Sequence, residues 1–524
     1  MSLRSSATIL IVLGLLVCGL GLYAAREATS FIPSLNLARP PLADAEIGVS
    51  SPSRRLTGRV VLIIVDGLRL DASRTMSTLN QLRAVGVDAE ASSHYPSMSR
   101  PNYVSIVAGV PPQWSGVRSN DYDLPVPLDS APKRAKQAGL GVSFVSQIAT
   151  GPRVMFGAHV DHSPVVPREA DLETAILTSL DGPDDLVAVL IGAVDIAGHA
   201  HGGASDEYAD AVGRVNAMLE RVLRKVDLQR DSVIVVADHG HIDDGGHGGL
   251  EPEVMTVPLI LAGAGFRAGA PLVRAQIIDV APTICALLGI PMPRHALGLA
   301  MIDSLAIGIV ERDAIRHADI TRIKAINQVT SAVQRRSEEE SWSTRLQRGG
   351  ASMLVLATLI TLTVWAARRA HVLIDLRVLL VAVPAFPLTF YAMVLSLEHM
   401  LTPSMVPPAG TLATQLFKYG MVAAAVYVVI GWIMVAHRAR ASDRVAAAAG
   451  LVLVGTIVML VPAALMWVIT GPPFTAAVPR PDVLMLPPTT YAAVACYSLG
   501  SVAFVAFEYI AYVRRSRPSS LAPA

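Results

Sequence analysis

The sequence predicts a doubly wound α/β domain followed by an α-helical bundle that spans a membrane. Short runs of β-branched and other apolar residues in the first half of the chain are typical of strands buried on both faces of a sheet. These runs are residues 60–65, 186–191 and 232–237. Long apolar runs in the second half can each cross a bilayer. They lie near residues 350–367, 377–397, 415–436, 445–470 and 489–512.

The composition indicates where these parts divide. The 524 residues are 52% hydrophobic, which is too high for a soluble chain, and the excess lies at the two ends. Residues 8–25 form an apolar run after Arg4, which predicts an N-terminal transmembrane signal anchor, with a cleaved signal peptide as the alternative. We therefore expect an anchor at 1–26, a linker at 27–57, an α/β domain at 58–310, a charged helical connector at 311–348, a five-helix bundle at 349–513 and a cytoplasmic tail at 514–524.

The charges of the loops predict an orientation. Basic segments at 368–369, 437–444 and 514–517 alternate with charge-poor loops near 400–414 and 471–487. Basic loops stay on the cytoplasmic side of a membrane, so we expect both termini in the cytoplasm and the α/β domain in the periplasm or an equivalent extracytoplasmic space. The net charge is +1 and no basic stripe is present, so nucleic acid is not an expected partner. The sequence carries no signal for an oligomeric state.

Candidate metal ligands follow each of the three predicted strands. Carboxylates and imidazoles lie directly after the runs, and ligand sites of open α/β sheets lie at the carboxyl ends of strands. One further histidine lies between glycines at 245–249, which allow a close approach of the backbone. The six candidates are Asp66, Asp195, His199, Asp238, His239 and His247.

A candidate nucleophile lies in a different segment. Ser99 precedes an apolar run at 104–107 and therefore lies just before a predicted helix start. The backbone N–H groups and the dipole at the start of a helix favour an anionic phosphoryl group. A hydroxyl at this position is well placed to attack phosphorus.

Each of these residues has an ordinary structural explanation when taken alone. An aspartate after a strand is usually a turn or a helix cap, and a histidine near glycine is usually a loop residue. Together, three strand ends supply the carboxylate oxygens and imidazole nitrogens that zinc accepts. His201 and His241 lie beside the candidates, and each is as well suited to line the cleft or hydrogen-bond to a ligand as to bind metal itself.

Residues 58 to about 292 resemble the alkaline phosphatase superfamily, and specifically its type I phosphodiesterase/nucleotide pyrophosphatase branch. The family pattern around the nucleophile is matched by Pro96, Ser99, Pro101 and Asn102. Ser99 therefore fits the nucleophile position better than Ser97. The resemblance implies an alkaline-phosphatase-like domain built on a doubly wound mixed sheet.

The resemblance also implies roles for the candidates. Asp195, His199 and His247 would hold one zinc ion, and Asp66, Asp238 and His239 would hold another, with other divalent metals such as Mn²⁺ as alternatives. Ser99 would be both the nucleophile and a ligand of the second metal. Asn120, further along the chain, matches an asparagine that donates to the phosphoryl oxygen.

The implied chemistry is phosphoryl transfer. Two zinc ions about 4 Å apart can stabilise the attacking and leaving oxygens of an in-line displacement. The metal beside Ser99 would lower the pKa of its hydroxyl, and a phosphoseryl intermediate would follow. Water then gives hydrolysis, whereas an alcohol gives transfer.

We therefore expect a membrane-bound phosphodiesterase or phosphotransferase that acts on an extracytoplasmic phosphodiester. A lipid-linked substrate and contacts with membrane lipids are expected because five spans are more than a tether needs.

Two alternatives remain. The layout of one N-terminal span, an exported metal domain and a C-terminal bundle is similar to that of the ethanolamine-phosphate transferases of glycolipid-anchor synthesis, as is Ser-Arg-Pro at 99–101. That similarity implies transfer of a phosphoethanolamine head group to a glycan or lipid. The second alternative is a transporter or scaffold with an inactive hydrolase domain, against which the complete ligand set argues. Residues 97–101 lack the sulfatase signature, so sulfate-ester hydrolysis is disfavoured.

Overall fold

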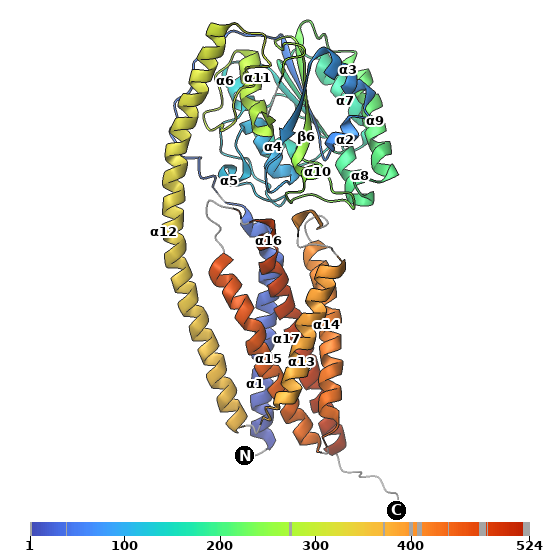
Figure 1. Cartoon of the computed structure of the whole chain (residues 1–524), viewed down its shortest axis with the longest axis vertical. Helices are drawn as coiled ribbons and strands as arrows, with labels where there is room; N and C mark the ends of the chain where they lie inside the picture. Colours follow the sequence, from blue (N-terminus) through green and yellow to red (C-terminus); the bar gives the residue numbers. More distant parts are fainter. Residues whose placement is uncertain are drawn as a thin grey trace, which may run out of the picture.

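An α/β domain sits on one end of a helical bundle, and one long helix runs along both (Figure 1). The computed structural model describes residues 3–37, 39–271, 275–369, 372–397, 402–405, 411–438, 440–470, 478 and 480–516. Residues 1–2 of the predicted anchor and 517–524 of the predicted tail lie outside the described part.

The domain is built on a mixed seven-stranded sheet of order β3-β4-β1-β5-β6-β2-β7. β3, β4, β1 and β5 run parallel, while β6 is antiparallel to both β5 and β2. The strands are β1 (Arg59–Val65), β2 (Val87–Ser92), β3 (Val142–Ser146), β4 (Leu186–Ile191), β5 (Asp231–Val236), β6 (Thr256–Gly263) and β7 (Ala275–Gln276). The mixed sheet expected from the sequence is confirmed.

Helices cover both faces of the sheet. α3, α7 and α9 lie on one side, and α4, α6 and α11 on the other (Figure 1). Strand β4 and residues 233–236 of β5 are fully buried, which explains why both consist of apolar residues without a break. The helices of the domain are α2 (Leu70–Ser73), α3 (Ser77–Val85), α4 (Ser99–Ala108), α5 (Pro112–Ser115), α6 (Ala131–Gln137), α7 (Glu169–Asp181), α8 (Ala193–His201), α9 (Asp206–Leu223), α10 (Pro252–Met255) and α11 (Val280–Leu288), with the short turns η1 (Pro33–Leu35), η2 (Pro152–Phe156) and η3 (Ile277–Asp279).

The second half of the chain forms the helical bundle that the sequence predicts. Within the described residues, five helices contain a stretch long and apolar enough to cross a membrane: Trp342–Trp365, Leu376–Ser396, Ala413–Ala436, Ser442–Ile469 and Leu486–Arg514. The helices are α12 (Ile309–Arg369), α13 (Leu376–Leu397), α14 (Thr411–Ala436), α15 (Ala441–Thr470), α16 (Pro481–Leu484) and α17 (Leu486–Ser516), with the turn η4 (Pro403–Met405). The N-terminal helix α1 (Leu3–Ser30) packs along α17.

Helix α12 joins the domain to the bundle without a break over 61 residues. It therefore contains both the charged stretch at 311–348 and the first span of the bundle. Near its start, the guanidinium of Arg322 donates to the carbonyl oxygens of Ala296 (2.9 Å) and Gly298 (2.7 Å). These buried hydrogen bonds fix α12 to the domain.

The ends of the bundle can be assigned relative to the domain. α1 begins and α17 ends at the end of the bundle far from the domain (Figure 1). The start of α1 and the end of α17 therefore lie on one side of the bundle and the domain on the other. Which side is cytoplasmic stays a prediction from the loop charges.

Candidate metal centre

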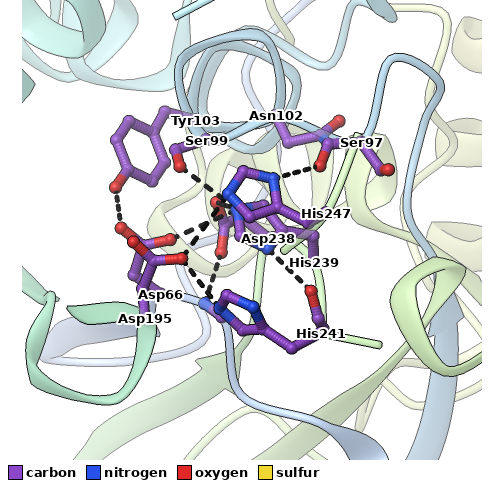
Figure 2. Close-up of polar contacts among 12 residues, drawn as sticks. Asp66, Ser97, Ser99, Asn102, Tyr103, Asp195, Asp238, His239, His241 and His247 are labelled. Atoms are coloured by element: carbon purple, nitrogen blue, oxygen red, sulfur yellow. Dashed lines mark hydrogen bonds and ion pairs between the residues drawn. The ribbon is translucent and has the colours of Figure 1, made fainter. Parts of the chain in front are cut away.

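The six predicted metal ligands meet at one edge of the sheet. β4, β1 and β5 are neighbouring parallel strands, so their carboxyl ends lie side by side. Asp66 directly follows β1, Asp238 lies two residues past β5, and Asp195 lies on α8 after β4. The six predicted ligands fall into two groups of three, and a third group, Asp195, His239 and His241, overlaps both sites; within each group the possible ligand atoms lie within 4.8 Å of one another. Figure 2 shows Asp66, Asp195, Asp238, His239 and His247 converging at this point.

The first group, called the Asp195 group, consists of Asp195, His199 and His247. Nε2 of His199 lies 3.0 Å from Nε2 of His247 and 3.5 Å from Oδ1 of Asp195. Asp195 and His199 share a face of α8 because they are four residues apart. Nδ1 of His247 lies 2.8 Å from the carbonyl oxygen of Ser97, to which it donates, so its Nε2 is left to bind a metal. The Asp195 and His199 side chains keep 13% and 21% of their surface exposed, so this group is partly exposed to solvent.

The second group, called the Asp66 group, consists of Asp66, Asp238 and His239, all fully buried. Nε2 of His239 lies 3.4 Å from Oδ1 of Asp66 and 3.2 Å from Oδ2 of Asp238. Neither of these two carboxylate oxygens has a hydrogen-bond partner among the described residues. The other oxygens accept hydrogen bonds, Asp66 from the Tyr103 hydroxyl and Asp238 from the N–H of Gly67.

The electrostatics of the site fit a divalent cation. Burial and the charge of Asp238 raise the pKa of Asp66 well above its usual range. Burial and the charge of Asp195 raise the pKa of Asp238 to about 8. Burial lowers the pKa of His239 to about 3, which keeps its imidazole neutral, as a metal ligand must be. Buried carboxylates with unpaired oxygens are costly without a compensating charge, and zinc accepts this oxygen and nitrogen donor set.

Ser99 faces the Asp66 group. It is the first residue of α4, and its Oγ lies 3.1 Å from Nε2 of His239. Ser97, the other candidate serine, is occupied: its hydroxyl donates to the carbonyl oxygen of Gly249 (2.8 Å) and accepts from the N–H of Gly248 (3.0 Å). The geometry therefore favours Ser99 over Ser97 as the reactive hydroxyl.

Asn120 is held next to Ser99. Its Oδ1 accepts a hydrogen bond of 3.0 Å from the backbone N–H of Arg100, the residue after Ser99. This contact leaves the amide nitrogen of Asn120 to donate elsewhere. The position matches the predicted role of Asn120, which stays a prediction.

Two side chains without a firm role in the sequence also contact the ligands. The Tyr103 hydroxyl donates to Oδ2 of Asp66, and Tyr103 lies four residues after Ser99 on the same face of α4. Nδ1 of His241 accepts from the N–H of Gly246 (3.0 Å), so its Nε2 donates to Oδ1 of Asp195 (2.9 Å). The spacing of four residues between Ser99 and Tyr103 was the feature of the sequence that could have predicted a place for Tyr103 beside the site. For His241, the structure shows a hydrogen bond to Asp195, and it also places His241 with Asp195 and His239 in a group that could hold a metal ion.

Two protein-family models match the α/β domain. Residues 60–138 match the family model of the type I phosphodiesterase / nucleotide pyrophosphatases, and residues 144–292 match that of the metalloenzyme superfamily. The predicted resemblance is confirmed. The domain thus resembles the type I phosphodiesterase branch of the alkaline phosphatase superfamily, whose members are metal-dependent enzymes that act on phosphoesters.

Individual relatives are distant. GPI ethanolamine phosphate transferase 1 of Mus musculus is 23% identical over 334 residues, covering 53% of this chain and 35% of its own length. The 2,3-bisphosphoglycerate-independent phosphoglycerate mutase of Nostoc punctiforme is 29% identical over 28% of this chain and 29% of its own. The structure of murine ectonucleotide pyrophosphatase / phosphodiesterase 5 aligns with a TM-score of 0.40 at 13% identity, covering 44% of this chain and 95% of that one. The chain spans about a third of the length of the transferases it matches.

Proposed function

We propose that this protein is a membrane-bound phosphodiesterase or phosphotransferase that uses two metal ions and a phosphoseryl intermediate. One observation carries the proposal: the Ser99 hydroxyl, at the start of a helix, faces a buried group of ligands in which two carboxylate oxygens have no hydrogen-bond partner among the described residues. A nucleophile and a metal site side by side are what a serine phosphotransferase requires.

The residues would divide the work as follows. Asp66, Asp238 and His239 would hold one cation and Asp195, His199 and His247 the other. These cations would supply the positive charge that lowers the pKa of the Ser99 hydroxyl and stabilises the leaving oxygen.

The chain itself positions the reacting groups. Oγ of Ser99 loses its proton to solvent and forms a bond to phosphorus as the ester P–O bond breaks, and the leaving oxygen takes up a proton from solvent and departs as the alcohol past the partly exposed Asp195 group. The free amide nitrogen of Asn120 donates to a phosphoryl oxygen, and the N-terminus of α4 favours its negative charge. Water or a second alcohol then enters from the same side and releases Ser99 from phosphorus.

Transfer of a head group is the second candidate. The match to GPI ethanolamine phosphate transferase 1 favours it, as does the membrane bundle that accompanies the domain. The loop that carries His247 contacts the bundle, because the N–H of Gly249 donates to Ser404 Oγ at 2.8 Å. A site on the membrane side of the domain suits a lipid-linked phosphodiester in the extracytoplasmic leaflet.

The decisive experiment is turnover by the full-length protein purified in detergent. A soluble diester, a soluble monoester and an extracted lipid fraction are offered with zinc and again after treatment with a chelator. We expect zinc-dependent release of alcohol from the diester or a lipid phosphodiester. A strong preference for the monoester would reject the diesterase assignment, and turnover that survives chelation would reject the metal mechanism. No turnover of any substrate, with metal bound, would favour the inactive-domain alternative.

A further inference from the structure

Residues 402–405, which lie between α13 and α14 in the sequence, contact the α/β domain. Thr402 and Ser404 are buried, with exposed fractions of 9% and 0%. The Ser404 hydroxyl accepts from the N–H of Gly249 (2.8 Å) and donates to Oε2 of Glu251 (2.5 Å). The Thr402 hydroxyl donates to the other oxygen of Glu251. Both oxygens of Glu251 are thus bound by hydroxyls of the bundle.

The same segment of the domain carries a metal ligand. His247 lies two residues before Gly249, and Ser97 joins the two: its hydroxyl bonds to Gly248 and Gly249, and its carbonyl oxygen accepts from Nδ1 of His247. Figure 2 shows Ser97 beside His247. A continuous set of hydrogen bonds therefore runs from Ser404 through Gly249 and Ser97 to the imidazole of His247.

The packing between residues 402–405 and this segment leaves no room for side chains at the glycines. A β-carbon at Gly248 would lie 3.1 Å from Cβ of Pro403, and the backbone there has a φ of +124°, which favours glycine. At Gly249 a β-carbon would lie 2.6 Å from Oγ1 of Thr402 and still closer to Oε2 of Glu251. The glycines around His247 therefore serve the contact with the bundle as well as the metal site.

We propose that Ser404 and Glu251 are positioning residues for the metal ligand His247, so that the membrane bundle helps to build the Asp195 group rather than only anchoring the domain. The inference rests on the proposed function only in that the Asp195 group binds a metal. Hydrogen-bond partners that orient a ligand typically change metal affinity by about ten- to a hundredfold. Loss of the Ser404 hydroxyl would leave the Gly249 N–H without its acceptor and free the 247–249 backbone to move.

The test measures zinc binding as well as turnover. The full-length protein in detergent is stripped with a chelator, and zinc is titrated back in competition with a chromophoric chelator. Ser404→Ala and Glu251→Gln are expected to weaken one of the two zinc sites by about tenfold or more and leave the other unchanged. Excess zinc should restore kcat, because the defect lies in metal affinity and not in folding.

Matched controls separate positioning from general damage. Glu253 lies two residues after Glu251, in the short helix α10. Ser396 is a serine of the bundle, and its hydroxyl donates to the carbonyl oxygen of Ala392 in its own helix. Glu253→Gln and Ser396→Ala should bind zinc as the wild type does. If Ser404→Ala fails to fold, two variants of Thr402 replace it. Thr402→Val loses the hydroxyl that binds Glu251, whereas Thr402→Ser keeps it. Only Thr402→Val should weaken zinc binding.

The outcomes distinguish this inference from the proposed function. The positioning role would be overturned if Glu251→Gln and Ser404→Ala both bind zinc with wild-type affinity. Thr402→Val takes the place of Ser404→Ala in this comparison if Ser404→Ala does not fold. A wild-type protein that binds no zinc at either site would overturn the proposed metal chemistry itself. Weakened zinc binding in the hydroxyl-lacking variants, with both controls intact, supports the positioning role whatever the substrate.

Discussion

The Ser99 hydroxyl lies 3.1 Å from Nε2 of His239, a residue 140 positions later in the chain. Ser99 is the first residue of α4 and His239 follows the carboxyl end of β5, so these two ends lie next to each other. Ser99 shares this point with Asp66 and Asp238, and burial raises the pKa of both aspartates. The relationship predicts what substitution of the serine will do.

Ser99→Ala should lower the rate by several orders of magnitude, because the hydroxyl that faces the Asp66 group and forms the covalent bond to phosphorus is lost. Ser99→Thr should keep part of the activity, since it keeps the hydroxyl. Ser97→Ala is the control for position, and its effect should be smaller. Steady-state kinetics on a diester checks all three variants. If Ser97→Ala proves the more damaging change, the nucleophile is misassigned by two residues.

Metal content should be about two zinc ions per chain, because the six predicted ligands divide into two groups of three that share no residue. Elemental analysis of active protein measures it, and one ion or none would contradict the two-site proposal. Removal of the metal should also lower the melting temperature of the domain. Ligands that bind only the folded state stabilise it by ~4 kcal/mol at about 1,000 times Kd. A melting temperature unchanged by chelator would indicate that the buried carboxylates do not need a cation.

Tyr103→Phe should weaken zinc at the Asp66 group by about tenfold, because the hydroxyl that orients Asp66 is lost while the ring is kept. Tyr122→Phe is a matched control. Tyr122 is also buried, but its hydroxyl donates to the carbonyl oxygen of Pro125 at 3.4 Å, away from the ligands. Zinc titration by competition compares the two variants. Equal affinities would show that Tyr103 serves packing alone.

The topology is testable with reporters. We expect both termini in the cytoplasm and residues 58–345 outside, because basic and charge-poor loops alternate along the bundle. A reporter that is active only after export should stay inactive when fused after Arg444, and a reporter that fluoresces only in the cytoplasm should fluoresce there. An extracytoplasmic reading at that position would reverse the orientation of the whole bundle and with it the proposed location of the substrate.

Much of this molecule could be predicted from local patterns. The strand runs, the carboxylates that follow them and the long apolar segments are visible because burial on both faces and burial in lipid each impose a composition on consecutive residues. Asp66, Asp195 and Asp238 could be grouped from the sequence alone, since neighbouring parallel strands end at one edge of a sheet. Two family models match residues 60–138 and 144–292, the stretches that contain these aspartates.

Helix α12, which joins the domain to the bundle, has a feature that local sequence patterns do not predict. The change in composition predicts a division at 348, beside Gly349 and Gly350, between a connector and a span, whereas α12 runs through both glycines. Glycine weakens a helix by only about 1 kcal/mol per residue, and no proline interrupts the stretch. Contacts of α12 with the domain through Arg322 and with α15 in the bundle hold the helix on both sides of the two glycines.

The sequence by itself determined the fold class, the membrane spans and the residue types at the metal centre, because each depends on neighbours along the chain. Only the tertiary structure decided which side chains hold those ligands in place. Tyr103 bonds to Asp66 across 37 positions, His241 to Asp195 across 46, and Ser404 to Gly249 across 155. A hydrogen bond forms only within about 3 Å and at a suitable angle, so it depends on how whole elements are placed. No periodicity within one segment carries that information.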